Sequence, residues 1–241
     1  LAKLGALLNA IEVEGRLHGV TFRVFAWISG DTSVVNLTNT AVFLAISNEC
    51  QKFISKTVNG NYLTGANRPM DGVLLDMEPT GVDNVRFTQY RLLMTAIRKG
   101  FVTSGAPAAT IGVAGQALAV NSSLWTWTET FYHFMARRVD FIVSMPYNSG
   151  IKDELLYRKY MSNQIRSVLR AVSGKTWNND ADHPAPTHGV KVFAGFGAYP
   201  ANANHVREVE SISNSALGTE SGLVGLLQNS DDLSENFFRG A

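Results

Sequence analysis

The stretch "MDGVLLDMEPTG", residues 70–81, places three acidic residues in an otherwise apolar run. A short apolar run bounded by glycine and proline is typical of a strand that is buried on both faces. Carboxylates are seldom fully buried unless they are paired with a cation or take part in chemistry. Asp71, Asp76 and Glu78 therefore need either a positively charged partner or a chemical role.

The spacing of the acids predicts how they lie on this strand. Side chains alternate along a strand, so Leu74, Asp76 and Glu78 share one face. If that face points into a barrel, the two acids lie at the carboxyl-end mouth, where barrel active sites are found. Two carboxyl groups this close hold one of the pair protonated, and a protonated carboxyl is a general acid. The alternative interpretation is a pair of strand-end acids that form ion pairs with lysine or arginine.

Composition limits the class of protein. A chain of 241 residues with 45% hydrophobic and 17% charged residues fits one globular domain, residues 1–241. A net charge of +1 gives no electrostatic basis for a nucleic-acid partner or an anionic membrane surface. The single cysteine, Cys50, excludes an internal disulfide. No apolar run approaches the roughly 20 residues of a membrane helix, so we expect no membrane insertion.

Helix-like and strand-like segments alternate along the chain, which predicts a parallel sheet with helices on its faces. Strands are expected at residues 20–30, 70–81, 109–118, 140–150, 189–200 and 221–230. Helices are expected near the start of the chain and at residues 37–56, 87–100, 124–139, 152–174 and 206–217. Asn36 or Thr38 is the expected N-cap of the second helix, and Gly100 is the expected stop of the third.

Six predicted strands leave two interpretations of the α/β fold. The first is a (β/α)8 barrel that lacks its first two strands, because the chain begins at Leu1 inside a helical pattern. The second is an open, doubly wound sheet. No glycine-rich phosphate-binding loop follows any strand, which favours the barrel. A truncated barrel would expose two strand edges, and we expect a second chain or another segment to cover them.

Two motifs resemble glycoside hydrolase family 18, the chitinases and endo-β-N-acetylglucosaminidases. "DGVLLDME" is similar to the family signature D-G-x-D-x-D-x-E, with Leu74 in place of an aspartate. "SMPYN" is similar to the motif M-x-Y-D of the sixth strand: Met145 and Tyr147 match, and Asn148 stands in place of aspartate. The order of the motifs makes the acidic strand the fourth, which also puts the missing strands at the N-terminus.

The resemblance implies retaining, substrate-assisted hydrolysis of β-linked N-acetylhexosamine-containing glycans, without a cofactor. In this mechanism the substrate's own acetamido oxygen attacks the anomeric carbon, an exception to the two-carboxylate scheme. Glu78 would protonate the glycosidic oxygen, Asp76 would hold the acetamido N–H, and Tyr147 would donate to the acetamido oxygen. The family also implies a secreted or extracytoplasmic location.

Further roles follow from the resemblance and from the predicted strand ends. Asp71 is expected to be structural, and six residues are expected to contact the glycan or polysaccharide: Asn148, Met145, Trp27, Tyr199, Gln228 and Trp125. Gln228 lies where the family often has a tryptophan. Trp127 also follows the fifth strand of the barrel, whereas Tyr132 and Phe134 are expected to fill the interface between helix and barrel.

Other functions remain open at this stage. His183 and His188 lie in a loop that precedes a strand, at the opposite end of a barrel from the acids, and we expect no metal site there. A lysozyme-like hydrolase of another barrel family could also carry D-x-E at a strand end. A non-catalytic, chitinase-like carbohydrate-binding protein is the third interpretation, and the presence of Glu78 argues against it.

Overall fold

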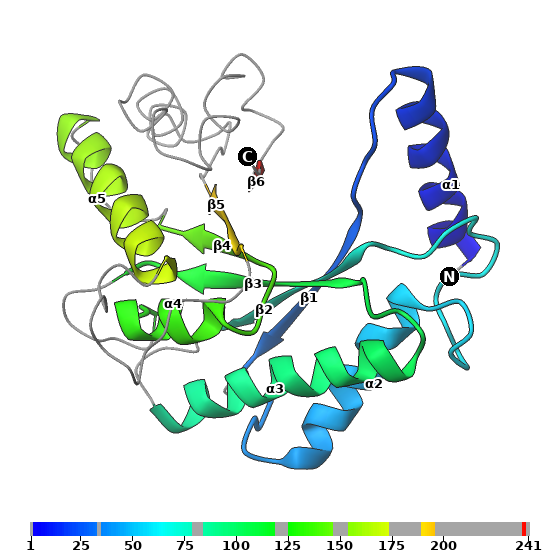
Figure 1. Cartoon of the computed structure of the whole chain (residues 1–241), viewed down its shortest axis with the longest axis horizontal. Coiled ribbons are helices and arrows are strands. Elements are labelled where there is room, and N and C mark those ends of the chain that lie inside the picture. Colours follow the sequence, from blue (N-terminus) through cyan, green and yellow to red (C-terminus); the bar gives the residue numbers. More distant parts are fainter. Residues whose placement is uncertain are drawn as a thin grey trace. The chain divides into compact units, whose positions relative to one another are not determined.

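The computed structural model describes residues 2–32, 35–78, 84–118, 125–146, 154–173, 189–195 and 238–239. Strands and helices alternate within these ranges, as Figure 1 shows. The helices are α1 (Ala2–Leu17), α2 (Thr40–Ile54), α3 (Asn84–Thr103), α4 (Glu129–Ala136) and α5 (Glu154–Val172). The strands are β1 (Phe25–Asp31), β2 (Gly72–Glu78), β3 (Thr110–Gln116), β4 (Phe141–Met145), β5 (Lys191–Gly195) and β6 (Phe238–Arg239).

The strands are hydrogen-bonded in the order of the sequence, from β1 to β6. The first five are parallel, which confirms the predicted α/β class with a parallel sheet. The short strand β6 pairs with β5 in the antiparallel direction, with Gly195 opposite Phe238. This antiparallel pairing is not part of the sequence prediction. The strand expected at 221–230 and the helix expected at 206–217 lie outside the described residues.

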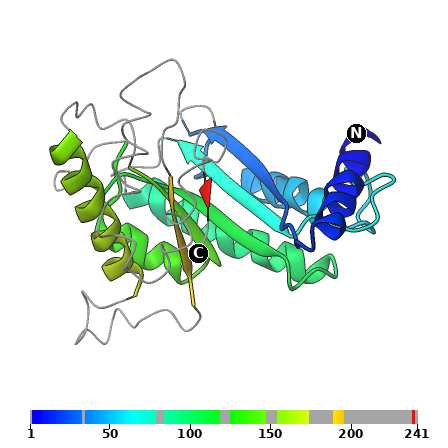
Figure 2. The same cartoon turned by 90° about the horizontal axis from the view of Figure 1, so that it is seen from above.

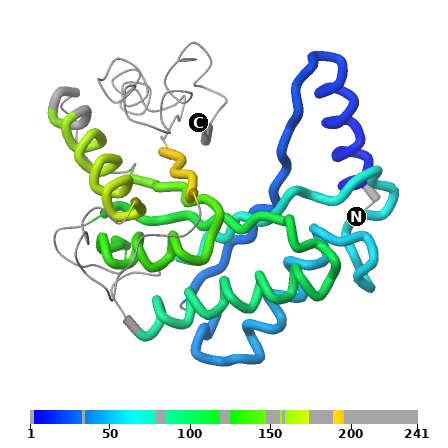
Figure 3. Tube along the Cα trace, in the orientation of Figure 1, coloured from blue at the N-terminus to red at the C-terminus, as the bar shows by residue number. Residues whose placement is uncertain are grey.

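The chain forms two compact units, which we describe separately. The first unit contains Leu1–Pro79 and Asn84–Gly112, and the second contains Thr80–Asp83 and Val113–Ala241. The Cα trace in Figure 3 follows β1, α2, β2 and α3 in turn through the first unit. Within the described residues, no helix combines the length and the apolar character that crossing a membrane requires.

In the first unit, α2 and α3 pack against each other on one face of β1 and β2 (Figures 1 and 2). Helix α2 begins at Thr40 with Asn39 as its N-cap, whose side chain accepts a hydrogen bond from the backbone N–H of Ala41. The prediction of Asn36 or Thr38 as the cap was therefore wrong. The Asn36 side chain instead accepts hydrogen bonds from the backbone N–H and the hydroxyl of Thr38, in a turn before the helix.

Helix α3 continues through Gly100 to Thr103, so the prediction of Gly100 as the helix stop was wrong. A Cβ atom at Gly100 would lie 2.5 Å from the hydroxyl oxygen of Ser47 in α2. The glycine therefore lets the two helices approach closely. The turn that follows the helix uses Gly105, which has a φ of 75°.

In the second unit, α4 is shorter than the helix predicted at 124–139. Its N-cap is Thr128, whose hydroxyl accepts a hydrogen bond from the backbone N–H of Phe131. Trp127 precedes the helix and is fully buried, and its backbone is bridged to Leu118 after β3. Tyr132 is fully buried between α4 and the strands, as expected of a residue that fills the helix–sheet interface.

We predict that Gly72→Ala lowers the free energy of unfolding by about 1–3 kcal/mol, the usual cost of overpacking. A Cβ atom at this position would lie 2.1 Å from the backbone oxygen of Thr110, and backbone atoms cannot rotate away. Urea denaturation measures the change. Gly189→Ala is the matched control, because a Cβ there meets no atom within 4 Å. Equal stability of both variants would contradict the close approach of β2 and β3 at Gly72.

Candidate functional site

The register of β1 against β2 brings polar and aromatic side chains together on one face. Trp27 lies opposite Leu74, and Asp31 lies opposite Glu78. Side chains at paired positions of parallel strands point to the same face, and every second residue returns to it. Trp27, Asp31, Asp76 and Glu78 therefore occupy the face away from α2 and α3. The two acids expected from the sequence thus lie beside two residues of the neighbouring strand.

Trp27 holds the inner acid in place. The indole N–H of Trp27 donates a hydrogen bond of 3.2 Å to Oδ2 of Asp76. The other oxygen, Oδ1, is buried and accepts no hydrogen bond from the residues that the structure describes. Trp27 is nevertheless 49% exposed, so about half of its surface faces solvent. Asp76 is therefore oriented by one oxygen and has an acceptor available on the other.

The environment of the acids favours their protonated forms. Burial raises the pKa of Asp76, and the hydrogen bond from Trp27 opposes that rise. Burial also raises the pKa of Glu78, and the charge of Asp76 raises it further. When the pKa of a group is higher in the folded state than in the unfolded state, its protonated form stabilises the fold. This contribution to stability is complete at pH values below the unfolded-state pKa, and it is lost as the pH rises through the folded-state pKa. Asp76 and Glu78 therefore lower the stability of the folded state at neutral pH relative to acidic pH.

Hydrogen bonds to backbone atoms of β2 fix the strand that carries the acids. The Tyr90 hydroxyl of α3 donates to the backbone oxygen of Leu75 at 3.3 Å. At the strand end, the backbone N–H of Thr32 donates to the oxygen of Glu78 at 2.9 Å. Val73 and Leu75 are fully buried on the helix side. These contacts leave the side chains of Asp76 and Glu78 at the free end of a rigid strand.

Asp71 lies at the other end of β2 and is satisfied within the fold. Its Oδ2 accepts hydrogen bonds from the backbone N–H of Val24 at 2.7 Å and from the Arg68 guanidinium at 2.9 Å. The contact with Val24 joins the segment before β1 to the start of β2. In this position Asp71 fixes where the two strands begin.

Among the other predicted site residues, two are described and belong to the second unit. Met145 ends β4 and is buried, with 8% of its surface exposed, while Trp125 precedes α4 and is 58% exposed. The remaining predicted residues lie outside the described part of the chain: Tyr147, Asn148, Tyr199, Gln228, His183 and His188. Within that described part, no group of three or more metal-binding side chains is found.

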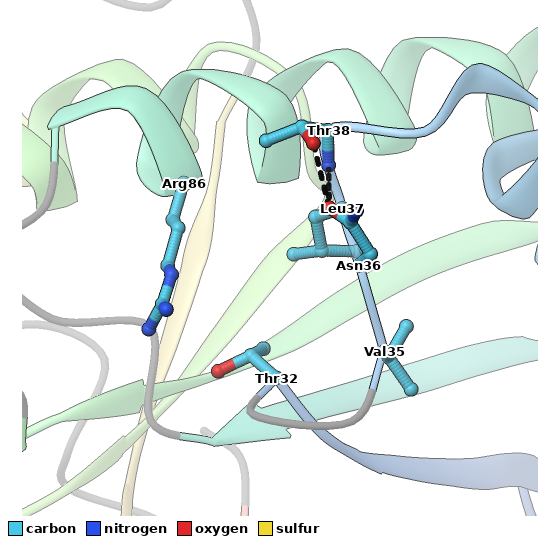
Figure 4. A pocket seen from close by; sticks show the side chains of 6 residues that line it. All are labelled: Thr32, Val35, Asn36, Leu37, Thr38 and Arg86. Carbon is cyan, nitrogen blue, oxygen red and sulfur yellow. Dashed lines mark hydrogen bonds between the residues drawn. The ribbon is translucent and has the colours of Figure 1, made fainter.

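A small cavity of about 230 Å³ lies behind the end of β1 (Figure 4). It is lined by Thr32, Val35, Asn36, Leu37, Thr38 and Arg86. Val35 packs toward Gly30, and Gly30 faces Met77, so the cavity is on the helix side of the strands. It therefore lies on the other side of the strands from the side chains of Asp76 and Glu78, and its volume is below the roughly 300 Å³ typical of ligand pockets. The acids on the other face remain the candidate site.

Sequence reasoning did not identify two polar residues at strand ends. Asp31 lies opposite Glu78, and only the register of the strands reveals this. Gln116 ends β3 and is buried, and its carboxamide has no hydrogen-bond partner among the described residues. A signal for Gln116 was present in the sequence, since it is the one strongly polar side chain in the apolar run "IGVAGQAL", residues 111–118.

Comparison with solved structures found a distant similarity to an inhibitor protein. The xylanase and alpha-amylase inhibitor protein from Scadoxus multiflorus shares 18% sequence identity and superposes with a TM-score of 0.41. The alignment covers 74% of this chain and 57% of the inhibitor, so the chain spans little more than half of that protein's length. No protein-family model matches the chain, and no curated protein matches it.

We predict that the pKa of Glu78 lies above its ordinary value of 4.5 and falls in Asp76→Asn. The variant removes the charge of Asp76 but leaves the burial of Glu78, so the pKa should decrease without returning fully to 4.5. NMR titration of the Glu78 side-chain carboxyl carbon measures both values. Asp31→Asn is the control, and it should change the pKa of Glu78 less. A larger change in the control would assign the coupling to the neighbouring strand instead.

Proposed function

We propose that the chain is the catalytic part of a glycoside hydrolase of the family 18 type, built on a (β/α) barrel. It would cleave β-linked N-acetylhexosamine-containing glycans with retention of configuration. The observation that carries this proposal is the state of Asp76. One oxygen is fixed by Trp27, and the other is a buried acceptor with no hydrogen-bond partner among the described residues. A substrate N–H is the kind of group that would satisfy it.

In the proposed mechanism Glu78 is the general acid. Its pKa is raised by burial and by Asp76, which extends the pH range in which the carboxyl keeps its proton. It donates this proton to the glycosidic oxygen and later accepts a proton from the attacking water. Asp76 Oδ1 accepts the acetamido N–H, which orients the acetamido oxygen toward the anomeric carbon. The carboxylate then stabilises the positive charge of the cyclic intermediate.

Trp27 supplies the hydrogen bond to Asp76 that Leu74, which replaces an aspartate of the family signature, cannot make. The family signature has an aspartate there, next to the residue that corresponds to Asp76, whereas this chain has the buried Leu74. The register partner of Leu74 is Trp27, whose indole donates to Asp76. A neutral donor on the neighbouring strand thus replaces a proton-sharing acid on the same strand. Asp76 keeps a fixed orientation, which the mechanism requires.

The exposed ring of Trp27 suits the same substrate. A flat aromatic face stacks on the apolar face of a sugar ring, and half of the Trp27 side chain is open to solvent beside Asp76. One residue can therefore orient the acid through its N–H and bind a sugar through its ring. Tyr147 and Asn148, outside the described residues, keep the roles that the family resemblance implies for them.

The two alternatives predict different behaviour. A lysozyme-like hydrolase would cleave peptidoglycan, and Tyr147→Phe would leave its rate unchanged. A non-catalytic binding protein would bind the glycan without cleaving it, and Glu78→Gln would then change nothing measurable. Both alternatives are thus tested by the same set of variants.

We predict that Glu78→Gln abolishes hydrolysis of chitin oligosaccharides and leaves their affinity within a few fold of the wild type. The amide keeps the shape of the carboxyl group but cannot donate its proton to the leaving oxygen. Product analysis measures the rate, and calorimetry measures the affinity. Glu49→Gln, in α2 of the same unit, is the matched control and should retain full activity. Wild-type turnover by Glu78→Gln would remove Glu78 from the mechanism.

We also predict that the first-formed product retains the β-configuration, and that thiazoline analogues of the cyclic intermediate inhibit the enzyme. Both results follow if the acetamido group, held by Asp76, is the nucleophile. Proton NMR of the product in the first minutes distinguishes the anomers. The inverted anomer as first product would rule out the substrate-assisted mechanism.

A further inference from the structure

Asp31 is the acid of the candidate face that the proposed mechanism does not use. It ends β1, and the strand register sets it opposite Glu78, the last residue of β2. Both strands belong to the first unit. Paired positions of parallel strands point to the same face, so the two carboxyl groups leave the sheet on the same side. Like charges at opposite positions of neighbouring strands destabilise a sheet, so the pairing by itself disfavours an acid at this position.

The strand β1 presents a row of exposed side chains on this face. Trp27, Ser29 and Asp31 are exposed, whereas the residues between them are half-buried. Trp27 and Asp31 lie four residues apart, about 13 Å along the strand, and the short side chain of Ser29 lies between them. A sugar chain that stacks on Trp27 and brings its glycosidic oxygen to Glu78 therefore passes Asp31 at the end of the strand.

A carboxylate in this position has two effects on a glycan. Its two oxygens accept hydrogen bonds and donate none, so they suit neighbouring hydroxyls of a sugar ring. Hydrogen bonds to a charged acceptor are stronger than those to a neutral one. The negative charge also repels a sugar that carries a carboxylate or a sulfate at the same point. Asp31 can therefore favour a neutral sugar and disfavour an anionic one at once, which is how specific sites reject competitors.

We propose that Asp31 is a specificity residue of the proposed glycan site. It accepts hydrogen bonds from hydroxyls of the sugar bound beside Glu78, and it excludes sugars that are negatively charged there. The inference rests on the proposed function and narrows its substrate class to neutral N-acetylhexosamine glycans. It adds a residue that neither family motif contains. It also separates this function from the lysozyme-like alternative, because every second sugar of peptidoglycan carries a lactyl carboxylate.

A pair of probes that differ only in charge tests the exclusion of anionic sugars. The acidic probe is the disaccharide of N-acetylglucosamine and N-acetylmuramic acid, and the neutral probe is its lactyl methyl ester. Calorimetry uses the full chain with Glu78→Gln as the parent, so that no probe is cleaved. We expect the parent to bind the acid about tenfold more weakly than the ester. Asp31→Asn should reduce this ratio by about three- to tenfold, the scale of two charges near a protein surface.

The hydrogen bonds to hydroxyls are tested with the neutral trimer N,N′,N″-triacetylchitotriose on the same parent. Asp31→Asn keeps one acceptor oxygen but loses the charge, so its dissociation constant should rise by at least about threefold. Asp31→Ala removes both oxygens and should bind the trimer more weakly still. Glu14→Gln is the matched control, because it removes one negative charge from an exposed position of α1. It should change neither the trimer affinity nor the ratio between acid and ester.

Two results would overturn the proposal while leaving the proposed function intact. One is an unchanged ratio between acid and ester in Asp31→Asn, including the case in which the parent already binds both probes equally. A merely structural role of Asp31 gives this result, because damage to the fold weakens binding of acid and ester alike. The other is unchanged affinity of both Asp31 variants for the trimer. If the parent binds none of the three sugars, the proposed function fails and this inference fails with it.

Discussion

The pairing of β1 with β2 in one fixed register is the constraint on which the candidate site depends. It sets Trp27 opposite Leu74 and thereby brings the indole N–H to Asp76. A shift of one residue would turn Trp27 to the helix side and remove the only described donor to that carboxylate. Asp71 helps to set this register, because its carboxylate binds the backbone N–H of Val24 just before β1. Asp71, a structural acid at one end of β2, thus helps to position Asp76, the candidate site residue near the other end.

The polar groups of this protein fall into two kinds. Some are fully satisfied within the fold, such as Asp71 with Arg68, and Gln164 with Leu118. Others include buried atoms without a hydrogen-bond partner among the described residues, such as Oδ1 of Asp76 and the carboxamide atoms of Gln116. Sites that bind ligands commonly keep such groups at a cost in stability, because only the bound state satisfies them. Asp76 lies near the carboxyl end of β2, and the carboxyl ends of strands are where parallel sheets bind their ligands.

Much of the fold was predictable from the sequence because buried parallel strands leave a strong local pattern. The runs that became β1 to β5 are short, apolar and bounded by turn residues, and the structure confirms them as strands. Helix ends were less predictable. The sequence pattern predicts that the helix ends at Gly100, but the helix continues. The glycine is instead needed because it lets α3 pack closely against Ser47 of α2. Asn36, Thr38 and Asn39 are all suitable caps for α2, and the chain uses Asn39.

Only part of the candidate site could be read from sequence. The acids stand out because charge is unusual in a buried strand, and alternation alone places them on one face. The contact between Trp27 and Asp76 joins residues 49 positions apart, and no local pattern encodes it. Leu74 illustrates the consequence: it stands where the motif that the chain resembles has an aspartate, so the motif alone suggests that Asp76 has lost a neighbouring polar group. The structure supplies a hydrogen-bond donor from the adjacent strand at the same level. The departure from the motif therefore changes which residue orients Asp76. The carboxylate still needs a hydrogen-bond partner to hold it in place, and Trp27 is that partner.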